Sequence, residues 1–247
     1  MRIGVFSDVH ANLEALEAVL KDSRAQGCTL LFCCGDVVGY GGCPNECCRI
    51  LRERNIETVK GNHDEAVAID FPLPPVYFNP AAAASILWTR EYTTVSNREW
   101  LDQLPMMLVK EDLGLTICHA SPINPQNWEY LTLPAKAASV LAVQKTPICF
   151  IGHSHQPRVF WTEQQESAVR VLPPCPVHLE PGERYLINVG SVGQPRDEDC
   201  RASYFIYDRE DELVFPRRVP YAVEGAQKRI RDAGLPDRLA DRLAVGR

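Results

Sequence analysis

The sequence predicts an α/β protein with two sheets, and three observations support this fold class. Up to about residue 155, short apolar runs alternate with amphipathic helical segments, an order typical of a largely parallel sheet with crossover helices. After that point the chain changes to short strand-like segments, which favours antiparallel pairing. The length of 247 residues and the apolar share of 45% allow a substantial core, and we expect one domain over residues 1–247.

Helix-start signals and apolar periodicity define the elements of the first part. Asn12 is placed to cap a helix whose apolar residues fall on one face, and Pro44 suits the first turn of a helix that reaches about residue 54. The other elements expected here are a helix at 134–145 and strands at 2–7, 30–34, 56–60, 113–118 and 147–151.

An insertion at about 65–105 interrupts this alternation. It contains a proline-rich loop at 71–75, followed by a mainly helical stretch at 81–104. Because it directly follows the loop at 61–64, we expect it to cover one side of a cleft. The rest of the chain is expected to form an amphipathic helical segment at about 221–247 and strands at 158–161, 168–172, 184–188, 202–207 and 213–217.

The charge balance argues against some classes of partner. Lys and Arg number 26 against 32 Asp and Glu, a formal net charge of −6, which disfavours a protein that binds the phosphate backbone of nucleic acids. A small phosphate ester is still compatible with this charge if a metal site supplies local positive charge. No apolar run is long enough to span a bilayer, and Asp8 comes too early for a signal peptide. We therefore expect a cytoplasmic protein without a membrane partner.

The ten cysteines are interpreted as free thiols. Half of them lie between residues 33 and 48, so a metal or iron–sulfur site must be weighed against ordinary buried cysteines. However, 33–34 and 47–48 are adjacent pairs, and the sequence contains no Cys-x-x-Cys motif. Several of the cysteines stand in strand-like apolar runs, where a free thiol behaves as a small buried hydrophobic group.

Polar side chains that can bind metals follow five of the predicted strands, at the edge where open α/β sheets bind ligands. Two pairs of them stand two residues apart, and on an extended segment such side chains point to the same side. Imidazole, carboxylate and carboxamide groups suit divalent metals such as Mn²⁺, Fe²⁺ or Zn²⁺, and there are enough of them for two ions. His178, in a proline-rich stretch, is interpreted as a surface residue. The candidate residues at the strand ends are Asp8, His10, Asp36, Asn62, His63, His119, His153 and His155.

The blocks that carry these residues resemble, in the same order, those of calcineurin-like metallophosphoesterases. They read Ser-Asp-Val-His at 7–10, Gly-Asp at 35–36, Gly-Asn-His-Asp at 61–64, Cys-His-Ala at 118–120 and Gly-His-Ser-His at 152–155. The stretches 35–41 and 188–197 further resemble a small bacterial and archaeal branch with YfcE-type phosphodiesterases and diadenosine-tetraphosphatase-like proteins. The resemblance runs from residue 3 to about 208. It implies a four-layer α/β/β/α sandwich of two mixed sheets flanked by helices.

The resemblance also implies a centre of two divalent metal ions with a hydroxide between them that attacks phosphorus. His63 would act as a general acid or stabilise the transition state, and Asp64 would either orient His63 or cap the next helix. Asp36 would bridge the two ions. By analogy, the other ligands would be Asp8, His10 and His155 for the first ion, and Asn62, His119 and His153 for the second.

Two further residues are candidates for substrate binding. Arg196 would grip a substrate phosphate, or it would form a salt bridge to Asp197 or Glu198. Asn12 would reach the site, or it would only cap its helix. For each residue the sequence leaves both interpretations open.

Other residues near these motifs are given structural roles. Trp88, Trp100 and Trp128 are expected to pack in the core rather than to stack on a base. Tyr40 and Ser191 lie in loops that could face a substrate, but the pattern does not select either of them.

The sequence therefore predicts a metal-dependent phosphoesterase that acts on a phosphodiester or on a nucleotide-type phosphate ester. Alternatives with the same site are a phosphomonoesterase and a protein phosphatase. A non-catalytic protein-binding scaffold of the same fold is a further alternative, which the full set of candidate ligands disfavours. A nuclease is disfavoured by the acidic charge balance.

Overall fold

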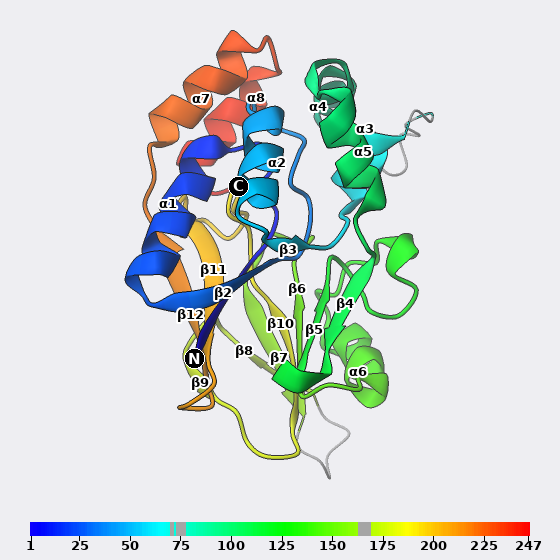
Figure 1. Ribbon diagram of the computed structural model, residues 1–247, viewed down its shortest axis with the longest axis vertical. Coiled ribbons are helices and arrows are strands. Elements are labelled where there is room, and N and C mark those ends of the chain that lie inside the picture. The colour runs from blue at the N-terminus through cyan, green and yellow to red at the C-terminus, as the bar shows by residue number, and fades with distance from the viewer. Residues whose placement is uncertain (70–71, 73–77, 163–168) are drawn as a thin grey trace.

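The computed structural model describes residues 1–69, 72, 78–162 and 169–247. Two six-stranded mixed sheets pack against each other, and helices cover the outer face of each (Figure 1). The expected loop at 71–75 and the start of the strand expected at 168–172 fall on positions outside the described residues, apart from Pro72 in the loop. No helix in the described ranges is both long enough and apolar enough to cross a membrane.

The first sheet joins strands from both ends of the chain. Its order is β3-β2-β1-β11-β12-β9, in which β1, β2 and β3 are parallel and the other pairings are antiparallel. The strands are β1 (Arg2–Phe6), β2 (Cys28–Cys33), β3 (Glu57–Thr58), β9 (Val177–His178), β11 (Ala202–Asp208) and β12 (Leu213–Val219).

The second sheet has the order β4-β5-β6-β10-β7-β8. Here β5, β6 and β10 are parallel, while β4, β7 and β8 pair in the antiparallel sense. The strands are β4 (Met107–Lys110), β5 (Leu115–Cys118), β6 (Ile148–Ile151), β7 (Arg158–Thr162), β8 (Arg170–Leu172) and β10 (Arg184–Asn188).

Three apolar clusters correspond to the three contacts between four layers. One lies between the sheets and contains side chains of both, such as Val5 and Phe150. A second lies between the first sheet and its helices, and a third lies under α6 on the second sheet. The helices are α1 (Leu13–Ala25), α2 (Pro44–Glu53), α3 (Asn62–Ala68), α4 (Pro80–Tyr92), α5 (Val95–Gln103), α6 (Pro134–Val143), α7 (Val223–Asp232) and α8 (Asp237–Asp241). The predicted four-layer arrangement is thereby confirmed.

Most expected elements are present, and the largest difference concerns the strands after residue 155. They do not form a separate antiparallel half, because β10 pairs in parallel with β6 while β11 joins β1 in the other sheet. The spacing of strands along the sequence indicates which neighbouring strands can form hairpins. Which sheet a strand joins depends instead on contacts between segments that are distant in sequence. The short strands β4 and β9 were not predicted, and β3 is only two residues long.

The helical predictions agree closely with the structure. Asn12 accepts a hydrogen bond from the Ala15 amide at 3.1 Å, as expected of an N-cap, and Pro44 begins α2. The insertion at 65–105 contains α4 and α5, which extend beside α3 (Figure 1). The C-terminal segment is amphipathic and helical as predicted, and it buries Ile230, Leu235, Leu239 and Leu243.

An ion pair fastens α1 to the first sheet and gives a test of this packing. Asp22 accepts hydrogen bonds from the Tyr204 hydroxyl at 2.6 Å and from the Arg217 guanidinium at 2.9 and 3.1 Å. Burial alone would raise the pKa of Asp22, but these donors outweigh it and lower the pKa. Because the folded-state pKa is depressed, the stabilisation is present at neutral pH and is lost as the pH falls through the folded-state pKa.

We expect Asp22→Asn to lower the free energy of unfolding at pH 7 by about 0.5–1 kcal/mol, a value that allows for solvent screening of a partly exposed pair. The difference from the unmodified protein should shrink as the pH is lowered from about 5 to about 2. Urea denaturation at several pH values measures it. The control is Asp232→Asn, which breaks an exposed pair with Lys228, and an equal effect of both variants would contradict the expectation.

Candidate metal centre

The predicted site residues lie together at the carboxyl ends of five strands. The loops after β1, β2, β5 and β6 and the first turn of α3, which follows β3, carry them, and they are buried except for the half-buried Asn62. Their ligand atoms form three groups within which all atoms lie within 4.8 Å of one another. These groups are Asp8 with His10 and His155, His10 with Asp36 and His63, and Asp36 with His119 and His153.

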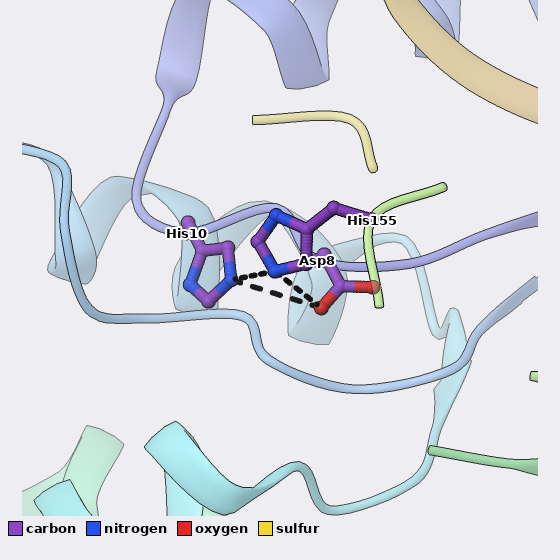
Figure 2. Close-up of side chains that lie close together, drawn as sticks. All are labelled: Asp8, His10 and His155. Atoms are coloured by element: carbon purple, nitrogen blue, oxygen red, sulfur yellow. Dashed lines mark hydrogen bonds and ion pairs between the residues drawn. The ribbon is translucent and has the colours of Figure 1, made fainter. Parts of the chain in front are cut away.

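The first group joins one carboxylate and two imidazoles (Figure 2). Nε2 of His155 lies 3.2 Å from Oδ1 of Asp8, and Nε2 of His10 lies 3.7 Å from the same oxygen. The two Nε2 atoms are 3.1 Å apart. All three side chains therefore direct an atom that can bind a metal toward the same small volume.

Main-chain carbonyl groups fix the tautomers of these imidazoles. Nδ1 of His10 donates to the carbonyl of Val38 at 3.0 Å, and Nδ1 of His155 donates to that of Gln194 at 2.6 Å. A carbonyl oxygen only accepts, so in each neutral ring the proton is on Nδ1 and Nε2 carries a lone pair. Two such lone pairs facing each other at 3.1 Å repel, and a cation between them would remove the repulsion.

The second group has the same construction. Nε2 of His119 lies 3.3 Å from Oδ2 of Asp36 and 3.1 Å from Nδ1 of His153. Oδ1 of Asn62 approaches the same Nε2 at 3.2 Å. Nδ1 of His119 donates to the carbonyl of Cys34 at 2.8 Å, which again leaves Nε2 as the free donor atom.

Asp36 stands between the two groups. Its Oδ2 lies 3.6 Å from Nε2 of His10 and 3.3 Å from Nε2 of His119, while its Oδ1 accepts the His63 amide at 2.8 Å. Asp8 is held in the same way as Asp36, because its Oδ2 accepts a hydrogen bond from the His153 amide at 3.0 Å. Each carboxylate thus has one oxygen fixed by the main chain and one oxygen turned to the imidazoles.

Electrostatics keep most of these groups in the forms that bind metals. Burial alone would raise the pKa values of Asp8 and Asp36, but the surrounding imidazoles hold both well below the ordinary value. Burial lowers the pKa of His153 to about 3 and, together with Arg196, lowers that of His155 to about 4. Burial also acts on His119, but Asp36 outweighs it and raises the pKa to about 9, so a metal ion would displace a proton there.

An unpartnered polar atom is a further sign that the first group fits a cation. Oδ1 of Asp8, the oxygen that faces His10 and His155, is buried and has no hydrogen-bond partner in the described ranges. Leaving a buried polar atom unpaired is costly, and such atoms call for an explanation. Carboxylate oxygens and imidazole nitrogens in this number suit divalent metal ions of the borderline class.

The local backbone differs from the sequence expectation. The paired residues Asp8 and His10, and His153 and His155, were expected to lie on extended segments. They instead have φ values of +55° and +48°, and of +64° and +58°. The side chains therefore converge because of left-handed turns after the strands, not because of extended alternation. Such conformations are unfavourable for residues other than glycine and cluster at functional sites.

Two glycines allow the loops to approach the carboxylates. A Cβ atom on Gly61 would collide with the carboxylate of Asp36. A Cβ atom on Gly152 would collide with the hydroxyl of Ser7 and the carboxylate of Asp8. These positions need glycine for space, since a side chain would push the carboxylates out of place.

We expect Gly152→Ala to lower the metal content after reconstitution and to lower the midpoint of thermal unfolding, because overpacking costs about 1–3 kcal/mol. Gly225→Ala is the matched control, since an added Cβ in α7 would have no neighbour closer than 3.5 Å. Elemental analysis and calorimetry measure the two effects. Full metal content in Gly152→Ala would argue that the loop does not position the donor atoms.

His63 lies beside the first group but is not oriented by Asp64. Its ring packs against His10 at a centroid distance of 4.9 Å and against Tyr40 at 4.5 Å, and its Nδ1 has no hydrogen-bond partner in the described ranges. Asp64 instead accepts the Val37 and Gly61 amides at 2.8 and 3.0 Å. Asp64 is not the N-cap of α3, which is Gly61, but it caps the helix from the third helical position by accepting the Gly61 amide, so the capping interpretation holds in part and the orientation of His63 does not.

Two aromatic side chains of the loop after β5 border the site. Tyr130 stacks on His153 at a centroid distance of 4.0 Å, and Trp128 meets the ring of His119 at 5.8 Å. The expectation that Trp128 packs in the core is therefore wrong, whereas Trp88 and Trp100 do pack against the core. Sequence reasoning missed Tyr130, and the only available signal was two aromatics in the loop that follows the His119 block.

The structure also separates the alternatives for the lesser candidates. Asn12 caps α1 through its oxygen and donates through its nitrogen to the Gly193 carbonyl at 2.9 Å, so its contacts are structural. Arg196 bonds Gln194 Oε1 at 2.8 Å and approaches the Tyr40 hydroxyl at 3.5 Å. Its expected alternative, a salt bridge to Asp197 or Glu198, is not formed.

The cysteines lie apart from this chemistry. All ten are free, and none belongs to a metal-binding group in the described part of the chain. Burial raises the pKa of Cys118 to about 12 and that of Cys28 to about 11, which leaves both thiols protonated at neutral pH. The interpretation as buried thiols agrees with these surroundings. His178 is exposed, as expected.

Comparison with known proteins agrees with this fold and site. The chain matches the calcineurin-like phosphoesterase superfamily domain over residues 1–212. It is 40% identical over 247 residues to an uncharacterized protein of Methanocaldococcus jannaschii, which covers 99% of this chain and 98% of that protein. A crystal structure of a metallophosphoesterase from Sphaerobacter thermophilus is 39% identical, with a TM-score of 0.85 and coverage of 100% and 99%.

A hypothetical protein from Pyrococcus horikoshii has the same fold at 20% identity, with a TM-score of 0.79 and coverage of 100% of this chain and 98% of that one. The chain belongs to the calcineurin-like phosphoesterase superfamily, as its sequence blocks predict. It is a phosphoesterase and thus a hydrolase. The histidine and aspartate groups described above are residues that could hold divalent metal ions for such a reaction.

Proposed function

We propose that the chain is a binuclear metal-dependent phosphoesterase that hydrolyses a phosphodiester or a nucleotide-type phosphate ester. The observation that carries this proposal is the position of Asp36, whose Oδ2 faces imidazoles of both groups at 3.3 and 3.6 Å. A carboxylate oxygen shared in this way is suited to bridge two cations. The first ion would be held by Asp8, Asp36, His10 and His155, and the second by Asp36, Asn62, His119 and His153.

The donor chemistry narrows the choice of metal. All the donor atoms are nitrogen or oxygen, which favours Mn²⁺, Fe²⁺ or Zn²⁺ over ions that prefer thiolates. When bound, two such ions supply a water acidic enough to act near neutral pH and positive charge for the phosphate oxygens. The chain holds the metal-binding atoms in rigid positions, because three of the imidazoles are hydrogen-bonded through Nδ1 to main-chain carbonyl groups.

His63 is proposed to serve the leaving group. It is buried beside the first group, and its Nδ1 is free to make a hydrogen bond. Burial holds the pKa of His63 well below its ordinary value, so the ring is neutral in this state and can donate from one nitrogen. Donation to the leaving oxygen would stabilise its developing charge.

Two other functions are alternatives to this proposal. A phosphomonoesterase or protein phosphatase would use the same donors and differ only in the groups around the phosphate. A non-catalytic scaffold would need no complete ligand set, and here every proposed donor is present and turned inward. A metal-replete sample that is inert toward mono- and diesters would favour the scaffold.

We expect Asp36→Asn to reduce bound metal and to slow hydrolysis of bis(p-nitrophenyl) phosphate by at least about 100-fold, because breaking a buried charged cluster costs about 3–5 kcal/mol. Elemental analysis and steady-state kinetics measure the two effects. Asp232→Asn serves as the surface control. Undiminished turnover in Asp36→Asn would refute the proposal.

We expect His63→Ala to slow turnover by about 10²–10³-fold, the usual effect of removing a hydrogen-bond donor that stabilises charge in the transition state, while both metal sites stay filled. The variant keeps the His63 amide that binds Asp36, so the donor cluster is not disturbed. Metal content and kcat are measured on the same sample. Loss of metal would instead make His63 a ligand, as its grouping with His10 and Asp36 allows.

A further inference from the structure

The ring of His63 is not oriented by a hydrogen bond. Its Nδ1 has no partner in the described ranges. The carboxylate of Asp64, its neighbour in the chain, is occupied by main-chain amides, among them those of Val37 and Gly61. The orientation of this imidazole must therefore come from the groups that pack around it.

Three aromatic rings surround the imidazole of His63. The ring of Tyr40 lies at a centroid distance of 4.5 Å with a tilt of 48°, while His10 and Phe78 meet the imidazole at nearly right angles, at 4.9 and 5.4 Å. The main chain of Gly39 borders the imidazole as well, because a Cβ atom on this residue would collide with Nδ1. His63 is buried, and close-packed neighbours leave a side chain few orientations.

Tyr40 is itself held in an unfavourable backbone conformation. Its φ of +59° lies in the left-handed region, which residues other than glycine keep only where the surrounding contacts require it. The Tyr40 amide donates to Oγ of Ser85 at 3.2 Å, and the same hydroxyl donates to the carbonyl of Ala82 at 2.8 Å. Ser85 is fully buried in α4. A helix of the insertion thus holds the loop that carries Tyr40.

Phe78 comes from the same part of the insertion. It directly precedes Asn79, the N-cap of α4, whose side chain accepts two amides of the first helical turn at 3.1 Å each. Phe78 and Tyr40 are both buried in the apolar cluster between the first sheet and its helices. Helix α4 is therefore connected to the imidazole by two routes, through Phe78 and through Ser85.

We propose that Tyr40 and Phe78 are positioning residues for His63 and that α4 holds both of them in place. This inference rests on the proposed function, in which His63 donates a hydrogen bond to the oxygen that leaves phosphorus. Such a donor is effective only at the correct place, and a displacement of about 1 Å can slow a reaction by about 100-fold. The insertion then has a part in the reaction, because it sets the position of the donor.

Two esters that differ only in their leaving group test this inference. Methyl phenyl phosphate releases phenolate, a much stronger base than the p-nitrophenolate of methyl p-nitrophenyl phosphate, so its hydrolysis depends more on a donor at the leaving oxygen. We expect Tyr40→Leu and Phe78→Leu to slow kcat for the phenyl ester by about 10–100-fold. The ratio of kcat for the nitrophenyl ester to kcat for the phenyl ester should rise by about tenfold.

A double-mutant cycle separates positioning from a general structural effect. In the His63→Ala background we expect Tyr40→Leu to leave this ratio unchanged, because no imidazole is left to be positioned. Tyr40→Phe is the conservative variant that keeps the ring, and it should recover the ratio that Tyr40→Leu loses. Bound metal is measured by elemental analysis on every sample.

Ser85→Ala tests the role of α4, and Ser23→Ala is its matched control. Both serines are buried in helices and donate to the carbonyl three residues earlier, at 2.8 Å from Ser85 and at 3.0 Å from Ser23. Of the two, Ser85 alone accepts the Tyr40 amide. We expect Ser85→Ala to raise the ratio by about two- to tenfold, the effect of one hydrogen bond, and Ser23→Ala to leave it unchanged.

The orientation of His63 can also be measured without turnover. In Zn²⁺-loaded protein with ¹³C-labelled histidine, the NMR signals of the His63 ring are assigned by their absence in His63→Ala. We expect these signals to shift and broaden in Tyr40→Leu and in Ser85→Ala, because the ring is less confined. They should keep their positions in Ser23→Ala.

The outcomes separate this inference from the proposed function. Equal slowing of both esters by Tyr40→Leu, a further change of the ratio in the His63→Ala background, or unmoved His63 signals would overturn the inference while the proposed function stands. Loss of bound metal in Tyr40→Leu would also overturn it, because the effect would then act through His10. If the unmodified metal-loaded protein hydrolyses no phosphate ester, the proposed function fails, and the NMR signals alone decide whether Tyr40 and α4 position His63.

Discussion

The geometry of the site depends on imidazole groups whose tautomers are set by hydrogen bonds to main-chain carbonyls. Main-chain carbonyls accept hydrogen bonds from Nδ1 of His10, His119 and His155, so the Nε2 atoms of all three rings face into a small volume. In the first group two of these nitrogens lie 3.1 Å apart, where neutral rings repel each other. A cation placed between these nitrogens would be attracted to both of them. It would also be attracted to the ionised oxygens of Asp8 and Asp36. The geometry is therefore arranged for bound positive charge.

Holding such a cluster in place requires a rigid frame and unfavourable backbone. Strands β1, β2, β5 and β6 lie in the two sheets and contribute to the apolar cluster between them, which fixes the points where the ligand loops start. The loops then turn at once through left-handed conformations, with φ of +53° at Asp36 and +64° at His153. Free energy from packing in the sandwich offsets this local strain. The glycines at 61 and 152 serve the same end, because they let neighbouring loops reach the carboxylates.

The sequence predicted the composition of the site better than its surroundings. Polar residues directly after apolar runs are a local pattern, so the donors could be found without knowing how the strands pair. Sheet membership could not, since the partners of β10 and β11 are distant in sequence. The same limit explains why Tyr130 was missed: nothing near it in sequence shows that it packs on His153. Backbone conformation was also beyond reach, because left-handed φ values at Asp8 and His10 oppose their intrinsic preferences.

The charge distribution reconciles an acidic chain with an anionic substrate. A net charge of −6 repels extended polyanions at long range, but this field is screened beyond about 10 Å at ordinary ionic strength. Within that distance, the local charges of the site decide what binds. Asp8 and Asp36 are turned inward to the proposed metals, while the guanidinium of Arg196 lies over the ring of Tyr40, which packs against His10. A small phosphorylated compound meets mainly these local charges, whereas an extended polyanion also meets the net negative charge of the chain.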